Sequence, residues 1–544
     1  MTDRTETPSA TRPPAPRDPL VLAIDLGTGG PKVALVGVRG AIVGHAKVPV
    51  GLVLVDGGGA EQDPAEWWSA VVAAARQVLG AHPERVDDVV AVGVTSQWFG
   101  TVAVDDAGDH LGPAVIWMDG RGARYVRRAV RGPVRIAGYD VRRLRAWLRR
   151  TGGIPSLTGK DPVGHIQFLR HERPDVYRDA ATFLEPVDYL GLRLTGRAAA
   201  SGASITGHWV TDNRDLARIT YDDELVAWTG IDRHKLPELV TTNSVLGPLA
   251  PTAADALGLR SGVPVVAGSS DTASAGIGSG AVDDRQAHLY VGTSSWLSCH
   301  LPDKHTDLRT NVTALPSGMP HRYWMATEQE SAGICLTWLA DQVLFPSDEL
   351  AGAEPPDDLF DRLNQVAAGV APGARGVVFT PWLNGERTPV DDATIRGGFH
   401  HLSLTTRRAD LVRAVFEGVA HNSRWMLAAA ERFVGSPFES LRFVGGGAQS
   451  ELWGQIMADV LDRPVHQVAE PVLANARGAA FAAAVATGHL RWDEIPALVP
   501  VTAIHHPDPS TRAVHDRTHA AFLDIYRRTK GIHRRLGRHP QEHP

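Results

Sequence analysis

The chain has 544 residues, of which 43% are hydrophobic and 21% charged, and this ordinary globular composition excludes a wholly disordered chain. At about 150 residues per domain, the length predicts two to four domains. Lys and Arg number 55 and Asp and Glu 61, so the net charge of −6 supplies no positive field for nucleic acid or an anionic membrane. The only two cysteines, Cys299 and Cys335, exclude a disulfide scaffold and a Cys-rich zinc module, and they fit a reducing compartment.

The N-terminal residues 1–18 are rich in Pro, Thr and Arg, a composition that predicts a disordered leader. They contain no apolar stretch of the kind found in a signal peptide. No apolar run elsewhere approaches the ~18 residues needed to cross a membrane. We therefore expect a soluble, cytoplasmic protein with no membrane partner.

Short apolar segments and glycine-containing turns alternate at the start of the ordered chain. Residues 21–27, 32–38 and 41–48 form three such segments, a pattern typical of an antiparallel meander. Residues 63–82 begin with an Asp-Pro pair and carry apolar residues at helical spacing, which predicts a helix. Residues 86–96 predict the next strand, and this alternation favours a layered α/β domain.

A second unit of the same kind begins at residues 287–300, with an apolar strand, a Gly-Thr pair, small polar residues and another apolar strand. Gly27-Thr28 and Gly292-Thr293 occupy equivalent places in the two units, which predicts two pseudo-equivalent domains that face each other. The glycines and serines of residues 261–282 suit a turn at the domain junction, and residues 510–532 predict one long helix. The predicted organisation is a leader at 1–18, an N-terminal domain at 19–265, a C-terminal domain at 266–535 and a basic tail at 536–544.

The first glycine turn, Asp25-Leu26-Gly27-Thr28-Gly29-Gly30-Pro31-Lys32, suits an anionic ligand. Its glycines let backbone N–H groups form an anion-binding nest, Thr28 adds a hydroxyl donor and Lys32 a positive charge. Asp25 would hold Mg²⁺, directly or through water. The turn lacks the Gly-Lys-Ser/Thr ending of a Walker A loop, and a hairpin turn with a salt-bridged Asp explains a single copy equally well. The second copy at Gly292-Thr293 favours two turns that hold a polyphosphate from both sides over a duplicated structural turn.

Three consecutive glycines, Gly445-Gly446-Gly447, separate an apolar strand from a helix that Ser450 is expected to cap. Such a junction leaves a flat backbone platform where a purine could lie, with helix N–H groups nearby. Many strand–helix turns are rich in glycine, so this signal is weak on its own.

Asp271 follows an apolar strand and is flanked by small residues, in Gly268-Ser269-Ser270-Asp271-Thr272-Ala273. This setting leaves room for a ligand beside the carboxylate, which could act as the base for an alcohol that attacks phosphorus. Asp before a Thr-Ala-Ser-Ala run is also a frequent helix N-cap, and the residues alone make the cap the more frequent interpretation.

Together these motifs resemble the FGGY carbohydrate kinases, from about residue 21 to about residue 490. The agreement around NGERTP and the helix ADLVRAVFEG is highly specific, because chance agreement over so many positions is implausible. Further matching segments are AEQDPAEWW (60–68), AVIWMDGR (114–121), FLEPVDYLGLRLTG (183–196), GIDRHKLPELV (230–240), PWLNGERTPVDDATIRGGF (381–399), LSLTTRRADLVRAVFEGVA (402–420) and ARGAAFAAAV (476–485).

The resemblance implies a duplicated actin-like (ribonuclease H-like) α/β ATPase fold, with ATP and a sugar in the cleft between two domains. It implies that Asp271 takes the proton from the sugar hydroxyl and that Mg²⁺ is held by Asp25 and Asp271, directly or through water. The residues that it assigns to nucleotide and phosphate are Asp25, Gly27, Thr28, Lys32, Gly292, Thr293, Gly333, Gly445, Gly446, Gly447 and Gln449.

Departures from the family pattern concern the choice of sugar. Family members that act on xylulose usually have Met-His-Gly after the residue that matches Gln97, whereas this chain has Trp98-Phe99-Gly100. The usual Trp-Asn-Asp is Trp117-Met118-Asp119, Ser-Ser replaces Gly-Gly before the base, and His165 replaces an expected lysine. The His and Asn side chains that would form hydrogen bonds with sugar hydroxyls are therefore absent. Trp98 and Phe99 either stack against the C–H surface of the sugar or pack under the cleft. The assigned substrate-binding residues are Gln97, Trp98, Phe99, Asp119 and Asp271.

We therefore expect an ATP- and Mg²⁺-dependent kinase of a small sugar, a ketopentose or a related polyol, with no nucleic-acid partner. A homodimer is left open. The rival hypotheses are an actin-like ATPase that acts as a switch, filament or chaperone, and a catalytically idle sugar-binding regulator. Asp271 and the segments at 381–420 argue against the ATPase, which has no evident need for them.

Overall fold

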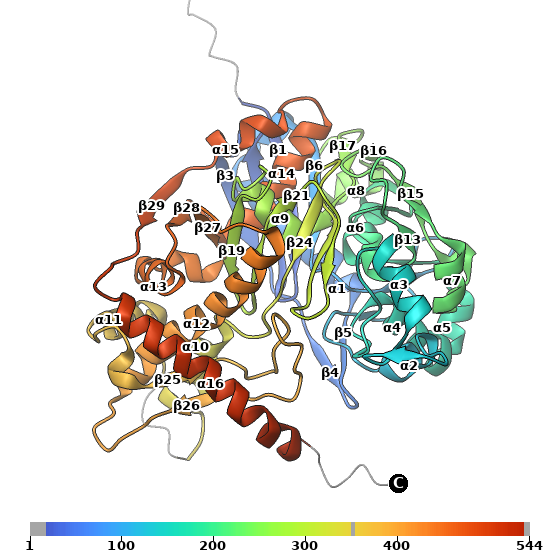
Figure 1. Cartoon of the computed structure of the whole chain (residues 1–544). Coiled ribbons are helices and arrows are strands. Elements are labelled where there is room, and N and C mark those ends of the chain that lie inside the picture. Colours follow the sequence, from blue (N-terminus) through green and yellow to red (C-terminus); the bar gives the residue numbers. More distant parts are fainter. Residues whose placement is uncertain (1–17, 350–353, 538–544) are drawn as a thin grey trace, which may run out of the picture.

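Two mixed β-sheets organise the chain, and the computed structural model describes residues 18–349 and 354–537 (Figure 1). The predicted leader, apart from Asp18, and residues 538–544 of the predicted basic tail lie outside the described residues. Each sheet contains one of the two Gly-Thr turns at the end of its first strand.

The first sheet has the order β16-β17-β6-β1-β2-β3, with β18 also paired to β6. Strands β1, β2 and β3 form the predicted antiparallel meander, and β6 is parallel to β1. The strands are β1 (Leu20–Gly27), β2 (Gly30–Gly37), β3 (Ile42–Lys47), β6 (Val89–Ser96), β16 (Val245–Pro248), β17 (Pro264–Val266) and β18 (Ser269–Ser270).

Helix α1 (Pro64–Ala81) packs on this sheet and begins where the sequence predicted. The Asp63 carboxylate accepts a hydrogen bond from Ala65 N, and Pro64 occupies the first helical position, where no backbone donor is needed. The apolar face of α1, including Trp67 and Val71, is buried against the sheet.

The second sheet, of order β20-β19-β27-β28-β29, repeats the arrangement of the first. Strands β19 and β20 form an antiparallel hairpin, and β27 lies parallel to β19 as β6 lies parallel to β1. The duplication predicted from the two Gly-Thr turns is therefore present. The strands are β19 (Ala287–Val291), β20 (Ser295–Ser298), β27 (Leu441–Val444), β28 (Val465–Val468) and β29 (Val501–His505).

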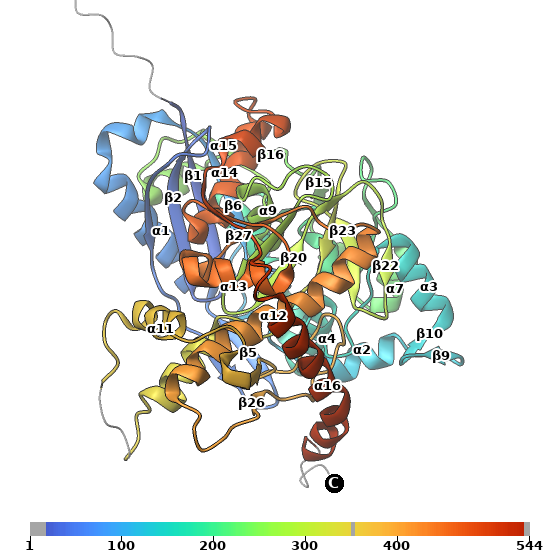
Figure 2. The same cartoon turned by 60° about the vertical axis from the view of Figure 1, so that its left-hand side comes forward.

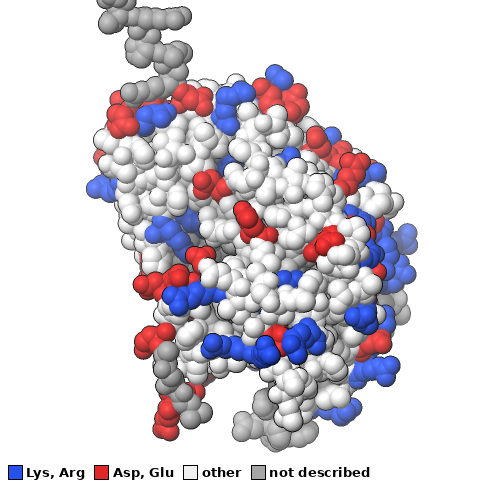
Figure 3. Space-filling model, turned by 90° about the vertical axis from the view of Figure 1, so that its left-hand side faces the viewer, with Lys and Arg blue, Asp and Glu red and all other residues white. Residues whose placement is uncertain are grey.

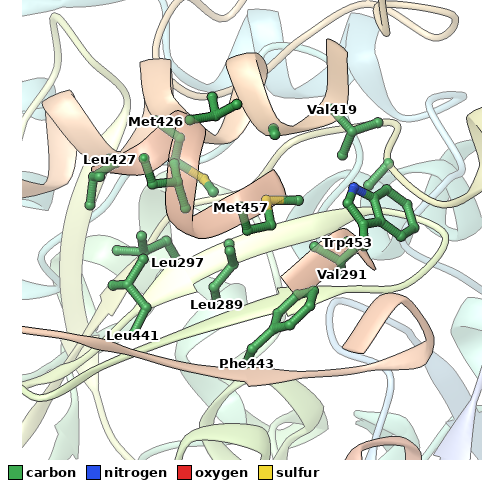
Figure 4. Close-up of a cluster of buried hydrophobic side chains, with 14 of the residues drawn as sticks. Leu289, Val291, Leu297, Val419, Met426, Leu427, Leu441, Phe443, Trp453 and Met457 are labelled. Atoms are coloured by element: carbon green, nitrogen blue, oxygen red, sulfur yellow. The ribbon is translucent and has the colours of Figure 1, made fainter. Parts of the chain in front are cut away.

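Helices α12 (Arg408–Val434) and α13 (Glu451–Leu461) cover one face of the second sheet. Figure 4 shows their side chains, among them Met426 and Met457, pointing toward Leu289 and Leu297 of the hairpin. Ser450 caps α13 as predicted, because its hydroxyl oxygen accepts a hydrogen bond from Trp453 N at 3.0 Å. This packing fixes the second Gly-Thr turn to a rigid core.

Helices α9 (Asp271–Gly278) and α14 (Ala474–Ala486) cross between the two sheets at backbone contact. A Cβ atom on Gly278 would lie 1.8 Å from Ala474 O, and one on Gly478 would lie 1.9 Å from Ser274 O. The junction segment 261–282 was predicted to be a turn, but it contains β17, β18 and α9. Its small residues permit the close helix crossing instead.

The remaining elements surround these layers. Helices α2 to α7 gather on one side of the first sheet, and the strands β21 to β24 form a separate sheet beside the second hairpin (Figure 1). Their bounds are α2 (Ala123–Ala129), α3 (Val141–Arg150), α4 (Pro162–Glu172), α5 (Pro174–Asp179), α6 (Pro186–Thr195), α7 (Asp223–Thr229), α8 (Pro251–Leu257), α10 (Ile334–Leu339), α11 (Leu359–Ala368), β21 (His300–Leu301), β22 (Thr306–Asp307), β23 (Val312–Pro316) and β24 (Tyr323–Ala326).

The predicted C-terminal helix is α16 (Arg512–Leu536), which lies beside α12 in both views (Figures 1 and 2). Charges of both signs are scattered over the face drawn in Figure 3, in keeping with the small net charge. Among the described helices, none combines the length and the apolar character that a membrane span requires.

Candidate active site

A cavity of about 970 Å³ is lined by residues from both halves of the chain. It brings together most of the predicted site residues, although they are far apart in the sequence. The predicted residues that line it are Asp25, Gly27, Thr28, Lys32, Gln97, Trp98, Phe99, Asp271, Gly292 and Thr293.

Asp25 and Lys32 face each other across the β1–β2 hairpin, where they form a register pair. Lys32 Nζ is bonded to Asp25 Oδ2, and the Asp25 side chain is only 1% exposed. Burial by itself would lower the pKa of Lys32, but Asp25, together with Tyr290 and Asp271, outweighs burial, and the pKa is raised. Lys32 therefore carries a fixed positive charge at the first glycine turn.

Asp271 is the first residue of α9, and its carboxylate lines the cavity. The cap interpretation is wrong, because Ser270 is the N-cap and its hydroxyl oxygen accepts from Ala273 N at 3.4 Å. One Asp271 oxygen accepts a hydrogen bond from Thr272 N at 2.8 Å. Burial, and secondarily the charge of Asp25, raise the pKa of Asp271 to about 7, so this carboxyl group can exchange a proton near neutral pH.

The two carboxylates also fit a magnesium ion. Asp25 Oδ1 is buried and has no hydrogen-bond partner among the described residues, so it is available as a ligand. The described residues contain no cluster of three or more His, Cys, Asp or Glu side chains that could hold a metal. Mg²⁺ that binds with a nucleotide commonly uses one or two carboxylates together with phosphate oxygens and water, so a larger cluster is not required for a site at Asp25 and Asp271.

Thr28 is held by its neighbours at the end of the first turn. Its hydroxyl donates to Gln97 Oε1 at 2.8 Å and accepts from Trp117 Nε1 at 3.0 Å. Gln62 Nε2 donates to the Thr28 carbonyl at 2.8 Å. The hydroxyl predicted to be a free donor is thus already used, and the network keeps the turn in one conformation.

The second turn is built by close backbone contacts. Gly333 N donates to Gly292 O at 2.7 Å, and Ala332 N donates to Thr293 O at 2.9 Å. A Cβ atom on Gly333 would lie 2.5 Å from Gly292 O. Gly333 therefore supports the second turn through a backbone hydrogen bond and does not line the cavity itself.

The triple glycine lies beside the strand that leads into the second turn. Gly445 has φ +90°, and a Cβ atom there would lie 2.5 Å from Val291 O. A Cβ atom on Gly447 would meet the Val291 side chain, whereas Gly446 faces open space. These three glycines and the exposed Gln449 do not line the cavity.

Trp98 and Phe99 pack against the core and also line the cavity. The two rings are half-buried, lie 4.6 Å apart between centroids and pack against a core cluster that includes Trp209. The same two side chains line the cavity. Packing therefore fixes the rings in place as part of the cavity wall.

Asp119 and His165 are not brought to the cavity. Asp119 is fully buried, accepts a hydrogen bond from Ala60 N at 2.9 Å and pairs with Arg121. His165 is also fully buried, and burial lowers its pKa to about 4. In this structure Asp119 orders the loop behind Trp117 rather than facing a ligand.

Sequence reasoning missed an ionic group in the lining of the cavity. Arg387 is bonded to Glu328 and Glu330, and all three line the cavity together with Asn384. NGERTP was recognised as specific, but its partners lie more than 50 residues earlier in the chain. The two glutamates in the sequence TEQES carried no local signal of that pairing.

Comparisons with known proteins agree with this architecture. The N-terminal domain model of the FGGY family of carbohydrate kinases matches residues 20–278, and its C-terminal domain model matches residues 287–487. A xylulose kinase of Escherichia coli (strain K12) is 29% identical, with 93% of this chain and 98% of the relative covered. A gluconokinase of Bacillus subtilis (strain 168) is 25% identical, with 93% and 95% covered.

The fold is also similar to solved structures. The crystal structure of a xylulose kinase from Rhodospirillum rubrum has a TM-score of 0.78 and 30% identity, over 95% of this chain and 100% of that one. Two family domain models in the expected order, relatives aligned over nearly their full length and a duplicated actin-like fold around one cavity lead to the same conclusion. The chain belongs to the FGGY family of carbohydrate kinases.

Proposed function

We propose that this kinase transfers the γ-phosphoryl group of ATP to a hydroxyl of a ketopentose or related polyol, with Asp271 as the general base. One observation carries the proposal: a carboxylate whose pKa is raised to about 7 lies in the same cavity as both Gly-Thr turns. A base with a pKa near the working pH is suited to take a proton from an alcohol.

Different residues of the cavity have different roles in phosphoryl transfer. The turns at Gly27-Thr28 and Gly292-Thr293 hold the phosphates from the two sides, and Lys32 adds positive charge. Asp271 accepts the proton of the attacking hydroxyl. Asp25 and Asp271 would hold Mg²⁺, which neutralises phosphate charge when it is bound. The sugar and the phosphates are thereby kept in line, so that positioning supplies much of the rate.

The choice of a small polyhydroxylated acceptor follows from the relatives and the cavity wall. The two relatives described above are named for xylulose and for gluconate, and both compounds are small polyhydroxylated acceptors. The aromatic rings of Trp98 and Phe99 would stack against the C–H face of such an acceptor. Loss of the usual His and Asn readers argues for an acceptor other than D-xylulose.

A coupled assay of ADP release over a panel of ketopentoses, polyols and aldonic acids tests the proposal. We expect ADP formation that depends strongly on one class of sugar. Slow hydrolysis that is independent of sugar would favour an ATPase switch. Binding of ATP and sugar without turnover would favour an idle regulator.

A further inference from the structure

Trp98, Phe99, Trp117 and Trp209 form one part of the cavity lining, here called the aromatic wall, and the indole N–H groups of this part are already used. The aromatic wall can contact the C–H face of a sugar, but its indole N–H groups cannot bond the hydroxyls without breaking existing hydrogen bonds. The three indole donors are committed as follows: Trp98 Nε1 to Ser204 O (3.1 Å), Trp117 Nε1 to Thr28 Oγ1 (3.0 Å) and Trp209 Nε1 to Asp161 Oδ2 (2.8 Å).

Another part of the cavity lining carries charged side chains. Arg387 Nε donates to Glu330 Oε1 at 2.5 Å, and its Nη1 is bonded to Glu328 Oε2. The segment of Glu328 is tied to the segment of Arg387, because Thr388 N donates to Glu328 O at 2.9 Å and Glu328 N donates to Thr388 Oγ1 at 3.2 Å. This ionic group is therefore held rigidly at the cavity.

The two glutamates differ in what they leave free. Both oxygens of Glu330 are used, since Oε2 accepts from Asn384 Nδ2 at 3.2 Å, and its side chain is 6% exposed. The Glu328 side chain is 33% exposed, and its Oε1 makes no hydrogen bond within the described part of the chain. Glu328 thus offers one carboxylate oxygen to the cavity, in an orientation fixed by Arg387.

Glu328 and Asp271 line the same cavity, in which the chemistry is proposed. The charge of Glu328 is among the groups that raise the pKa of Asp271, after burial and Asp25. The Arg387 guanidinium carbon lies 6.0 Å from the centre of the Trp117 ring, so the ionic group approaches the aromatic wall. An acceptor bound beside Trp117 would lie next to both the aromatic wall and this ionic group.

We propose that Glu328, oriented by Arg387, binds a hydroxyl of the acceptor sugar and determines sugar specificity in place of the polar readers that the aromatic wall lacks. This inference rests on the proposed function, because it assigns the acceptor to this cavity. Glu330 and Asn384 act as positioning residues that keep Arg387, and through it Glu328, in one orientation.

The test compares Glu328→Gln with a matched control, Glu451→Gln, which changes an exposed glutamate in the first turn of α13. We expect Glu328→Gln to raise the KM for the best panel sugar about 10-fold or more, because a hydrogen bond to a charged group is lost. The KM for ATP should stay at its wild-type value, the Tm should fall because one partner of the Arg387 ion pair is neutralised, and the control should change neither KM value. Equal changes in both KM values or an unchanged sugar KM would overturn the inference.

Direct binding separates this inference from the proposed function. Trp98, Trp117 and Trp209 line the cavity, so intrinsic fluorescence can report binding of the panel sugars without turnover. Wild-type binding that Glu328→Gln weakens about 10-fold, with no phosphorylation by either protein, would support the inference and refute the kinase proposal. If no panel sugar changes the wild-type fluorescence or gives turnover, both are refuted.

Discussion

At the residue scale, the raised pKa of Asp271 depends on which hydrogen bonds and ion pairs its neighbours already make. Ser270 caps α9, so the Asp271 carboxylate is not needed for that purpose. Lys32 is bonded to Asp25, and its charge only partly offsets the burial that raises the pKa of Asp271. The result is a carboxylate that is half-buried and faces the cavity.

We expect Asp271→Asn to lower kcat by about 100-fold or more while nucleotide binding stays nearly intact, because only the proton acceptor is lost. Steady-state kinetics and ATP titration measure the two effects. Asp303→Asn, on an exposed loop, is the control and should behave as wild type. A variant at 271 that keeps most of its turnover would contradict the role of base.

The pH dependence of the wild type provides a second test of Asp271. The base works only when it is deprotonated, and its pKa is raised from 3.8 to about 7. Activity, measured as kcat/KM for the sugar, should therefore fall as the pH is lowered through about 7. Activity that is constant down to pH 5 would show that another group accepts the proton.

At the element scale, the crossing of α9 and α14 shows why small residues occupy a segment that was expected to be a turn. Gly278 and Gly478 let the two backbones touch, and a side chain at either place would collide with a carbonyl oxygen of the other helix. Neither helix can withdraw easily, because α14 also packs on β6, where a Cβ atom on Gly93 would lie 2.4 Å from Ala479 O.

Gly478→Ala should lower stability by about 1–3 kcal/mol, as expected when a well-packed contact is overfilled. Calorimetry would show a lower Tm. Gly80→Ala in α1 is the matched control, because a Cβ atom there meets nothing within 4 Å. Since alanine is the better helix former, the control should be neutral or slightly stabilising. A Tm for Gly478→Ala equal to that of wild type would contradict the tight crossing.

Sequence signals were sufficient where the deciding contacts are local. The meander, the Asp63 cap of α1 and the Ser450 cap of α13 each depend on residues within a few positions, and all three are confirmed. The α9–α14 crossing and the pairing of Arg387 with Glu328 join distant segments, and glycine or glutamate alone does not reveal its partner. The same limit explains why Asp119 was expected in the cavity, although Arg121 and Ala60 N occupy its carboxylate.

At the scale of the whole molecule, three histidines join the C-terminal helix α16 to α12. The ring centre of His421 lies 5.8 Å from that of His515 and 5.7 Å from that of His519. Burial lowers the pKa of His515 and His519 to about 4, and burial together with the other two rings lowers that of His421 well below its usual value. Arg413 and Arg424 face this group and oppose its protonation further, while Asp516 favours it.

The free energy of unfolding should therefore decrease as the pH is lowered. Above pH 6.5 these histidines are neutral in both the folded and the unfolded chain and cost nothing. As the pH falls from 6.5 toward 4, the unfolded chain takes up protons that the folded chain does not, and folding weakens by about 2 kcal/mol or more in total. His519→Gln should reduce this loss of Tm between pH 7 and pH 5, whereas the exposed control His506→Gln should not. Equal acid sensitivity of wild type and His519→Gln would contradict the assignment.

The crossing of α9 and α14 also has a mechanical consequence. The glycine backbones touch there, and Arg477 Nε also donates a hydrogen bond to Gly278 O at 2.7 Å across the contact. Buried side chains of both helices belong to one apolar cluster with strands β1, β2 and β27, so the crossing ties the two sheets to each other. A movement of one sheet relative to the other would have to displace these two helices.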